Sequence, residues 1–285
     1  MIKPIKYFFE AFFIYIFFLI IKLIGLSLSR QVFSFIFKTI GPIIKSRNVI
    51  DKNLLKFSKD LSDEKKKEIE SNMWSNYGMT FVEYIFLKEF RKQKSHVNIE
   101  GEKILHQIFL NDKPVIFVSG HFANFELMSM EITKKKIKLA TIYRPLNNFF
   151  LNPFMEHIRK NQVCKNQIKK GRAGMKEVVE FINNNHSIAL MIDQRVSEGE
   201  KVKFFKEEAF TTTLPGQLAL KYNLDIVPVF IEREKNNSFN MKVYEPINQS
   251  NYKNKFDISL KLNQILEKMI IKNPNQWIWT HDRWK

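Results

Sequence analysis

Cysteine is nearly absent from this 285-residue chain, and glycine and proline are scarce: it has one cysteine, Cys164, nine glycines and nine prolines. A single cysteine excludes an internal disulfide framework and any zinc site built on cysteines, so the protein needs no oxidising compartment. Acidic residues are also in deficit, with 29 Asp and Glu against 46 Lys and Arg, a formal charge of +17. This charge predicts acidic partners, whether nucleic acid, anionic lipid or an acidic protein.

Apolar residues are concentrated at the N-terminus, where nine of the 27 Phe fall within the first 40 residues. The segment from Tyr7 to Leu28 carries only two charged residues, Glu10 and Lys22. Its uninterrupted apolar run, 11–21, is too short to cross a bilayer, but the whole segment is just long enough if Lys22 snorkels. We predict a membrane anchor, spanning or interfacial; a buried core helix and a signal peptide without a cleavage site are weaker interpretations.

Basic residues accompany the apolar segment on both sides. They are Lys3, Lys6, Lys22, Arg30, Lys38, Lys45 and Arg47. Such residues suit anionic lipid headgroups, so anionic membrane lipids are expected partners. Because both flanks are basic, the distribution of positive charge leaves the orientation of the anchor open.

The remainder of the N-terminal region is predicted to be helical. A helix is expected over 32–44, closing at Gly41-Pro42. Ser62, followed by two acids, is a typical helix start, and that helix should run to about Phe90. We therefore expect residues 1–95 to form an N-terminal membrane anchor and helical region.

From residue 96 onward short apolar runs alternate with amphipathic stretches. Strand-length runs lie at 114–118, 139–143, 188–192 and 226–231, and helical patterns lie at 122–134, 148–161, 175–184, 215–222 and 257–272. Near-continuous apolar strands alternating with helices predict an α/β fold with a largely parallel sheet flanked by helices. We expect residues 96–285 to form this core.

The first strong strand runs into Gly120 and His121, with Glu126 five residues beyond His121. In α/β sheets functional groups collect where strands end and helices begin. Five residues on a continuous helix would place His121 and Glu126 about 140° apart. With His121 in the loop, its ring can instead fold back onto Glu126, which would fix the tautomer and free the other nitrogen as a base. A structural histidine is the alternative interpretation.

The segment 120–126, Gly-His-Phe-Ala-Asn-Phe-Glu, resembles the His-four-residues-acid motif of glycerolipid acyltransferases, and in detail the bacterial lipid A biosynthesis lauroyl/myristoyl acyltransferase family. The resemblance continues in 46–54, in Trp74, Asn76, Gly78 and Glu83, in 143–148, in 171–174, in 192–194, in 211–216 with 227–229, and in the tail 274–284. It covers about residues 5–285. The sequence departs from the family at Asp193-Gln194-Arg195, where many members carry a second His or Asp.

The resemblance implies that a fatty acyl group is transferred from acyl carrier protein to a hydroxyl of a Kdo-bearing lipid A precursor. No metal or redox cofactor is implied. The carrier protein is acidic and the acceptor carries phosphates and carboxylates, so a charge of +17 suits both partners. Because the carrier protein is cytoplasmic, the core should face the cytoplasm at the bacterial inner membrane.

We assign the following roles to the residues of this predicted site as hypotheses. His121 would remove the proton of the acceptor hydroxyl and Glu126 would orient His121, while backbone N–H groups at the Gly120 turn would stabilise the oxyanion. Substrate binding is assigned to Arg144, Arg172, Asp193, Asn124 and Gly120. For Arg144 a structural ion pair and for Arg172 a solvated basic loop stay open. For Asp193 two further roles stay open, an orienting residue of the active site and a helix cap.

Other function classes are less consistent with the sequence. No Gly-x-Ser-x-Gly elbow supports a serine hydrolase, and no zinc finger or RNP-type motif supports nucleic-acid binding. An acyltransferase for another lipid, a lysophospholipid or glycolipid, is one alternative, and a non-catalytic basic membrane-surface adaptor is another. For the tryptophans of the tail, core packing is favoured over a belt at the lipid interface.

Overall fold

The computed structural model describes residues 2–44, 47–93 and 96–285. Lys45 and Ser46, and residue 95 at the expected domain boundary, lie outside the described residues. The N-terminal part contains α1 (Ile2–Ile24), α2 (Leu26–Ile44), α3 (Arg47–Phe57), α4 (Asp63–Glu83), the 3-10 turn η1 (Tyr84–Phe86) and α5 (Leu87–Lys92). The Ser62 side chain caps α4 by accepting a hydrogen bond from the Lys65 N–H, as predicted.

The rest of the chain alternates strands and helices. In order it contains β1 (Val97–Glu100), α6 (Glu102–Asn111), β2 (Ile116–Ser119), α7 (Glu126–Lys134), β3 (Leu139–Tyr143), α8 (Asn152–Ile158), the π-helical turn η2 (Arg159–Val163), β4 (Asn166–Lys169), α9 (Arg172–Asn183), β5 (Ser187–Met191), β6 (Glu200–Phe204), β7 (Glu207–Thr211), α10 (Leu214–Tyr222), β8 (Ile226–Arg233), β9 (Phe239–Val243), η3 (Gln249–Asn251), α11 (Lys255–Lys272) and η4 (Pro274–Gln276).

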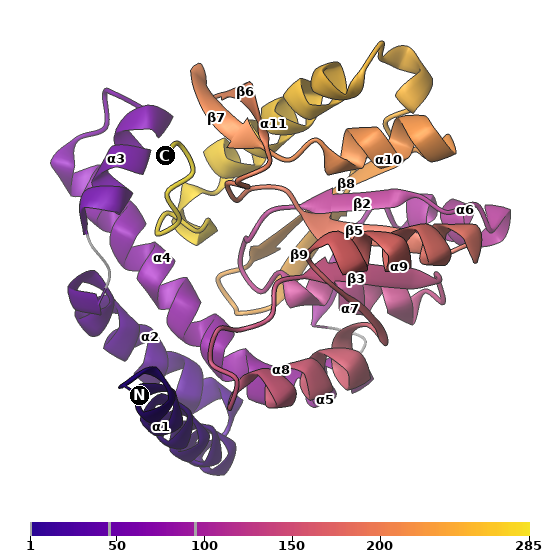
Figure 1. The fold of residues 1–285 in the computed structure, drawn as a ribbon. Coiled ribbons are helices and arrows are strands. Elements are labelled where there is room, and N and C mark those ends of the chain that lie inside the picture. Colours follow the sequence, from indigo (N-terminus) through magenta and orange to yellow (C-terminus); the bar gives the residue numbers. More distant parts are fainter. Residues whose placement is uncertain (1, 45–46, 94–95) are drawn as a thin grey trace.

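A seven-stranded sheet in the order β1-β9-β8-β2-β5-β3-β4 forms the centre of the molecule (Figure 1). Its strands pair in parallel except for β8 and β9, which are antiparallel. The predicted α/β class with a largely parallel sheet is confirmed. The short strands β6 and β7 form a separate hairpin.

Both faces of the sheet are buried. Along β2, Phe117 packs into one apolar cluster while Ile116 and Val118 pack into another on the opposite face. Helices α6 and α7 contribute to the first cluster, α9 and α10 to the second, and α11 to both. This double coverage explains why the central strands read as continuous apolar runs instead of alternating ones.

Two helices differ from the expectation. Helix α2 does not close at Gly41-Pro42 but continues through Pro42 to Ile44. Gly41 allows a close approach there, because an added Cβ would lie 2.2 Å from a ring atom of Trp74. The helix expected to reach Phe90 is interrupted by η1 before α5 begins.

The strands β1, β4, β6, β7 and β9 and the helix α6 were not predicted. Four of these five strands are either at a sheet edge or in the separate hairpin. In the edge strands β1 and β4 only one residue of four is buried. Such strands need no continuous apolar run, so their sequences carry a weaker pattern.

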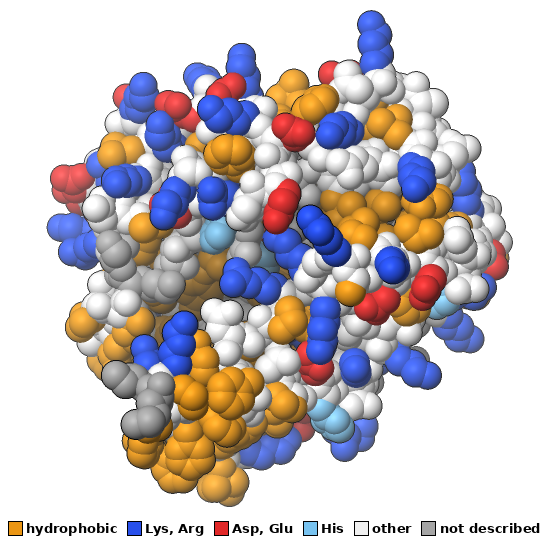
Figure 2. Space-filling view, viewed as in Figure 1, with side chains coloured by type: hydrophobic (Ala, Val, Ile, Leu, Met, Phe, Trp, Pro, Cys, Tyr) orange, Lys and Arg blue, Asp and Glu red, His pale blue; other side chains and the backbone are white. Residues whose placement is uncertain are grey.

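The N-terminal helices lie against the body of the molecule (Figure 1). One face of α1 packs inward, with Phe18 stacked on Phe154 of α8 at a centroid distance of 5.3 Å and Ile21 fully buried. The other face is apolar and exposed, and Figure 2 shows hydrophobic side chains gathered over these helices. Among the described residues α1 is the one helix long and apolar enough, over Lys3–Ile24, to cross a membrane.

Candidate active site

The register of the central strands brings two distant residues together at the carboxyl edge of the sheet. Strands β2 and β5 are parallel neighbours in which Ser119 pairs with Met191, the last residue of each strand. His121 and Asp193 each follow two residues later, so they emerge side by side. Arg144 follows the end of β3, the next strand along, at the same edge.

Asp193 holds His121 in place. One carboxylate oxygen lies 2.7 Å from His121 Nδ1, and the other accepts hydrogen bonds from the His121 backbone N–H at 2.8 Å and from Trp277 Nε1 at 2.9 Å. The His121 ring also packs edge-to-face against Phe125 at 4.6 Å between centroids. Nδ1 therefore carries the proton toward Asp193, and Nε2 is the nitrogen left as a base.

The contacts within the pair keep Asp193 ionised and make His121 a stronger base. Burial alone would raise the pKa of Asp193, but the charge of His121 and the three donors outweigh it and keep that pKa below its usual value. Burial alone would lower the pKa of His121, yet the Asp193 carboxylate dominates and the net effect raises it. The Glu126 charge adds a smaller rise.

Glu126 makes different contacts from those expected. Its Oε1 accepts hydrogen bonds from Tyr84 Oη at 2.7 Å and from Arg159 Nε at 2.8 Å, and in the described chain it makes no hydrogen bond with His121. The carboxylate keeps the pKa of Arg159 above its ordinary value despite burial. The orienting contact that the sequence analysis assigned to Glu126 is thus made by Asp193.

The loop between β2 and α7 is tightly packed, and three of its N–H groups donate within the protein. An added Cβ on Gly120 would lie 2.7 Å from the Phe122 ring and 3.3 Å from Asp193 Cβ, so glycine is needed for close approach. The left-handed backbone conformation falls on Ala123, with φ of 44°. The N–H groups of His121, Phe122 and Ala123 donate to Asp193, Gly120 and Gln276 respectively.

His121 lies in a cleft with two adjoining lobes. The inner lobe, about 370 Å³, is lined by His121 and Glu126 together with apolar side chains such as Phe125, Met128 and Leu190. Four basic side chains also line it: Arg144, Arg159, Lys170 and Arg195. The outer lobe, about 890 Å³, is lined by basic residues that outnumber the two acids, Glu198 and Asp282. Its basic residues are Arg144, Lys169, Lys170, Arg172, Arg195 and Lys285. Figure 2 shows Lys and Arg side chains around a hollow near the centre of this face.

The remaining predicted residues fall in two groups. Arg144 lines both lobes and Arg172 lines the outer one, and both are exposed. Asn124 is fully buried, with its Nδ2 donating to Glu83 at 3.0 Å, and neither Asn124 nor Gly120 lines the lobes. These two residues shape the loop instead of facing the cleft.

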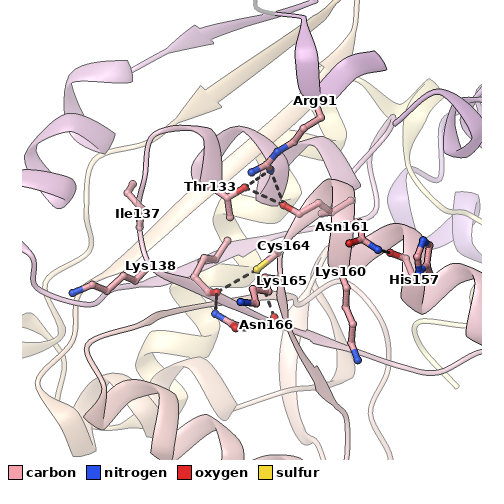
Figure 3. Close-up of a pocket in the computed structure, with 12 residues that line it drawn as sticks. Arg91, Thr133, Ile137, Lys138, His157, Lys160, Asn161, Cys164, Lys165 and Asn166 are labelled. Atoms are coloured by element: carbon pink, nitrogen blue, oxygen red, sulfur yellow. Dashed lines mark hydrogen bonds between the residues drawn. The ribbon is translucent and has the colours of Figure 1, made fainter. Parts of the chain in front are cut away.

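A separate cavity of about 790 Å³ lies at the opposite, amino-terminal ends of β3 and β4 (Figure 3). Arg91 is engaged there by Thr133 at 2.7 Å and by backbone carbonyls. Burial raises the pKa of the Cys164 thiol to about 11, so it is protonated at neutral pH and a poor nucleophile. In the described part of the chain no three His, Cys, Asp or Glu side chains are grouped to hold a metal ion.

Sequence reasoning missed the side chains that complete the site. Tyr84 and Arg159 reach Glu126, Trp277 reaches Asp193, and His281 lines both lobes. None has a local signal, since each comes from an element more than 30 residues away from its partner. Trp277 and Trp279 are buried, which confirms the expected core packing of the tail.

A His–Asp pair at the carboxyl edge of an α/β sheet, with the aspartate buried and the histidine open to a cleft of apolar and basic side chains, is suited to removing a proton from a bound hydroxyl. The chain matches the family model for bacterial lipid A biosynthesis acyltransferase over residues 3–285. It belongs to that family, whose members transfer acyl groups in lipid A biosynthesis.

Individual relatives are distant. The lipid A biosynthesis palmitoleoyltransferase of Escherichia coli is 26% identical over 253 residues, which covers 86% of this chain and 80% of that protein. A lipid A biosynthesis acyltransferase of Haemophilus influenzae is 22% identical over 79% of this chain and 73% of its own length. Among solved structures, the 1-acyl-sn-glycerophosphate acyltransferase PlsC of Thermotoga maritima is 14% identical with a TM-score of 0.44, covering 89% of this chain and all of that one. Family and N-terminal apolar helix together indicate association with membranes.

Proposed function

We propose that this protein transfers a fatty acyl chain from acyl carrier protein to a hydroxyl of a Kdo-bearing lipid A precursor, with His121 as the general base. The observation that carries the proposal is the His121–Asp193 pair at 2.7 Å on the wall of a cleft whose lining combines apolar and basic side chains. The apolar side chains suit an acyl chain, and the basic ones suit a phosphorylated, carboxylated acceptor.

The reaction needs a base because the pKa of an alcohol lies far above 7. His121 Nε2 takes the hydroxyl proton as the oxygen attacks the thioester carbonyl, a step in which a positioned base contributes about 10²–10⁴-fold. The resulting imidazolium is stabilised by Asp193, which has three donors and no need to accept a proton itself. No protein nucleophile is required.

Glu126 acts at a second position in the same cleft. Held by Tyr84 and Arg159, it adds negative charge near His121, which favours the imidazolium that forms during transfer. Arg159 is charged, as arginine is at any physiological pH, and Glu126 raises its pKa further. The Glu126–Arg159 pair therefore contributes to the electrostatic field around His121, while Asp193 sets the orientation of its ring.

Arg144 and Arg172 bind anionic groups of the substrates in the outer lobe. Both side chains are exposed, and in the described chain neither forms an ion pair. A guanidinium without a protein partner is available for a bidentate contact with phosphate or carboxylate. The basic lobe would also attract the acidic carrier protein, and the site would face the cytoplasm from the inner membrane.

Mass spectrometry of the lipid product tests the proposal. Membranes carrying wild-type protein, His121→Ala or the surface control His106→Ala receive mixed acyl-acyl carrier proteins and a Kdo-lipid A precursor. We expect a mass gain of one acyl chain with the wild type and with His106→Ala, and its loss with His121→Ala.

Two results would contradict the proposal. Undiminished transfer by folded His121→Ala would remove His121 from the mechanism. No gain with any donor from folded wild-type protein would exclude this acceptor and direct the assay to lysophospholipids and glycolipids.

A further inference from the structure

The attacked thioester carbonyl develops negative charge that needs hydrogen-bond donors. The natural donors would be the N–H groups of the turn that carries His121. Those of His121, Phe122 and Ala123 already donate to Asp193, Gly120 and Gln276. These three N–H groups are therefore not free for the oxyanion, which directs the search to other donors that line the inner lobe.

His281 is held in that lobe with a defined orientation. Its ring Nε2 accepts a hydrogen bond from the Arg195 backbone N–H at 2.9 Å, and its carbonyl accepts one from Asn53 Nδ2 at 2.8 Å. Because Nε2 is an acceptor, the proton of the neutral ring lies on Nδ1. In the described chain Nδ1 has no hydrogen-bond partner, and it is not among the buried unpartnered atoms, so it is an accessible atom of a residue that lines both lobes.

The surroundings favour the neutral ring. Burial lowers the pKa of His281, the charges of His121 and Arg283 lower it further, and Asp193 and Asp282 oppose them without reversing the effect. At neutral pH the ring is therefore an uncharged donor. An uncharged donor does not compete with His121 for Asp193 or repel the imidazolium that forms in the same lobe.

We propose that His281 donates its Nδ1–H to the thioester carbonyl oxygen and stabilises the oxyanion during acyl transfer. This role rests on the proposed function. His281 lines both lobes, as expected for a group next to the atom where the acyl chain and the acceptor meet.

The step balances without any further reactant. The acceptor oxygen forms a bond to the thioester carbon and loses its proton to His121 Nε2, while the carbonyl oxygen takes the negative charge and accepts the His281 hydrogen bond. The oxyanion then collapses, the carbon–sulfur bond breaks, and the leaving thiolate receives the proton from His121. The products are an ester and a thiol, and both histidines return to their starting states.

Two substitutions separate this role from a structural one. His281→Gln can still place a carbonyl oxygen near the position of Nε2, so it keeps the acceptor for Arg195 but has no donor at the position of Nδ1. His281→Asn places an amide nitrogen near Nδ1, so it keeps the donor and loses the acceptor. The full-length protein in detergent, an acyl-acyl carrier protein and the Kdo-lipid A precursor are used for both.

We expect His281→Gln to lower kcat by about 10²–10³-fold with KM for either substrate changed by less than about 3-fold. His281→Asn should retain kcat within about 10-fold of the wild type. Thermal unfolding of each variant confirms that it is folded.

The opposite order, with Gln active and Asn inactive, would make His281 a structural anchor for Arg195 and overturn the proposal. Equal activity of all three proteins would leave the oxyanion to the N–H groups at the start of α7 and also overturn it. A wild type without transfer would instead overturn the proposed function, and with it this role.

Discussion

His121 lies near two carboxylates that are held in different ways. Asp193 is fully buried and accepts three hydrogen bonds, two of them from His121 itself. Glu126 is bound by Arg159 and Tyr84 and affects His121 through its charge alone. The two acids therefore separate the orientation of the base from the electrostatic field around it.

Substitution of each carboxylate by its amide distinguishes these roles through the pH dependence of kcat/KM. Only the neutral imidazole is a base, so wild-type activity should rise with pH through a His121 pKa above 6.5. Asp193→Asn removes the largest raising influence and leaves burial, so the acidic limb should move to lower pH. Because an amide nitrogen would also favour the wrong tautomer, kcat should fall by about 10²–10⁴-fold.

Glu126→Gln is the comparison variant. It removes a smaller charge effect, so its acidic limb should move in the same direction but by less than in Asp193→Asn. A larger displacement with Glu126→Gln than with Asp193→Asn would return the orienting role to Glu126.

At the scale of elements, α4 connects the N-terminal helices to the loop that carries His121. Thr80 donates to the Ala123 carbonyl at 3.1 Å, and Glu83 accepts the Asn124 amide. Glu83 is also paired with Arg30 of α2 at 2.7 Å and with Arg233 of β8. One buried carboxylate thus joins α2, α4, β8 and the site loop.

Glu83→Gln should be strongly destabilising. Burial alone would raise the pKa of Glu83, but the two guanidiniums outweigh it and the pKa lies below 4.5. Removing the charge leaves Arg30 and Arg233 buried without compensation, which costs about 3–5 kcal/mol of unfolding free energy. Chemical denaturation in detergent at pH 7 measures this loss.

The exposed pair Lys65–Glu68 gives the matched control, since Glu68→Gln should cost no more than about 0.5 kcal/mol.

The pH dependence of stability checks that the charge of Glu83 is the cause of the loss. With its pKa lowered in the folded state, Glu83 stabilises fully above pH 4.5 and progressively less as the pH falls through its folded value. Glu83→Gln should lack this contribution, and an unchanged stability at pH 7 would contradict the account.

At the scale of the whole molecule, one side is apolar and the cleft is basic. The outward face of α1 exposes about half of each of Phe8, Phe9, Phe12 and Phe13, and Phe149 and Phe150 lie beside it. The inward face of α1 packs on the body through Phe18. We therefore expect α1 to lie in the plane of the membrane interface, with its outward apolar face inserted into one leaflet.

Vesicle flotation tests the membrane surface. The double substitution Phe9→Ser with Phe13→Ser should lower partitioning onto anionic vesicles by more than about 10-fold, since each buried Phe is worth about 1.5–3 kcal/mol. Phe256→Ser, at a similarly exposed position on α11, should leave partitioning unchanged. Equal binding of all three proteins would show that this face does not carry the membrane contact.

The sequence by itself determined the central strands, most of the long helices, the apolar N-terminus and the position of His121 after a buried strand. These features follow from local periodicity, which depends on neighbours a few residues apart. The resemblance to the family was also confirmed, because the family model matches residues 3–285. Local spacing also suggested Glu126 as the partner of His121, since the two are five residues apart.

Tertiary structure alone decided which carboxylate holds His121. Asp193 is 72 residues away and reaches the ring because β2 and β5 are neighbours whose ends are in register, a pairing set by packing on both faces of the sheet. The same is true of Arg159, Trp277 and His281, which come from a π-helical turn and the C-terminal tail. Strand order and register are collective results of burying two apolar faces, so no short segment encodes them.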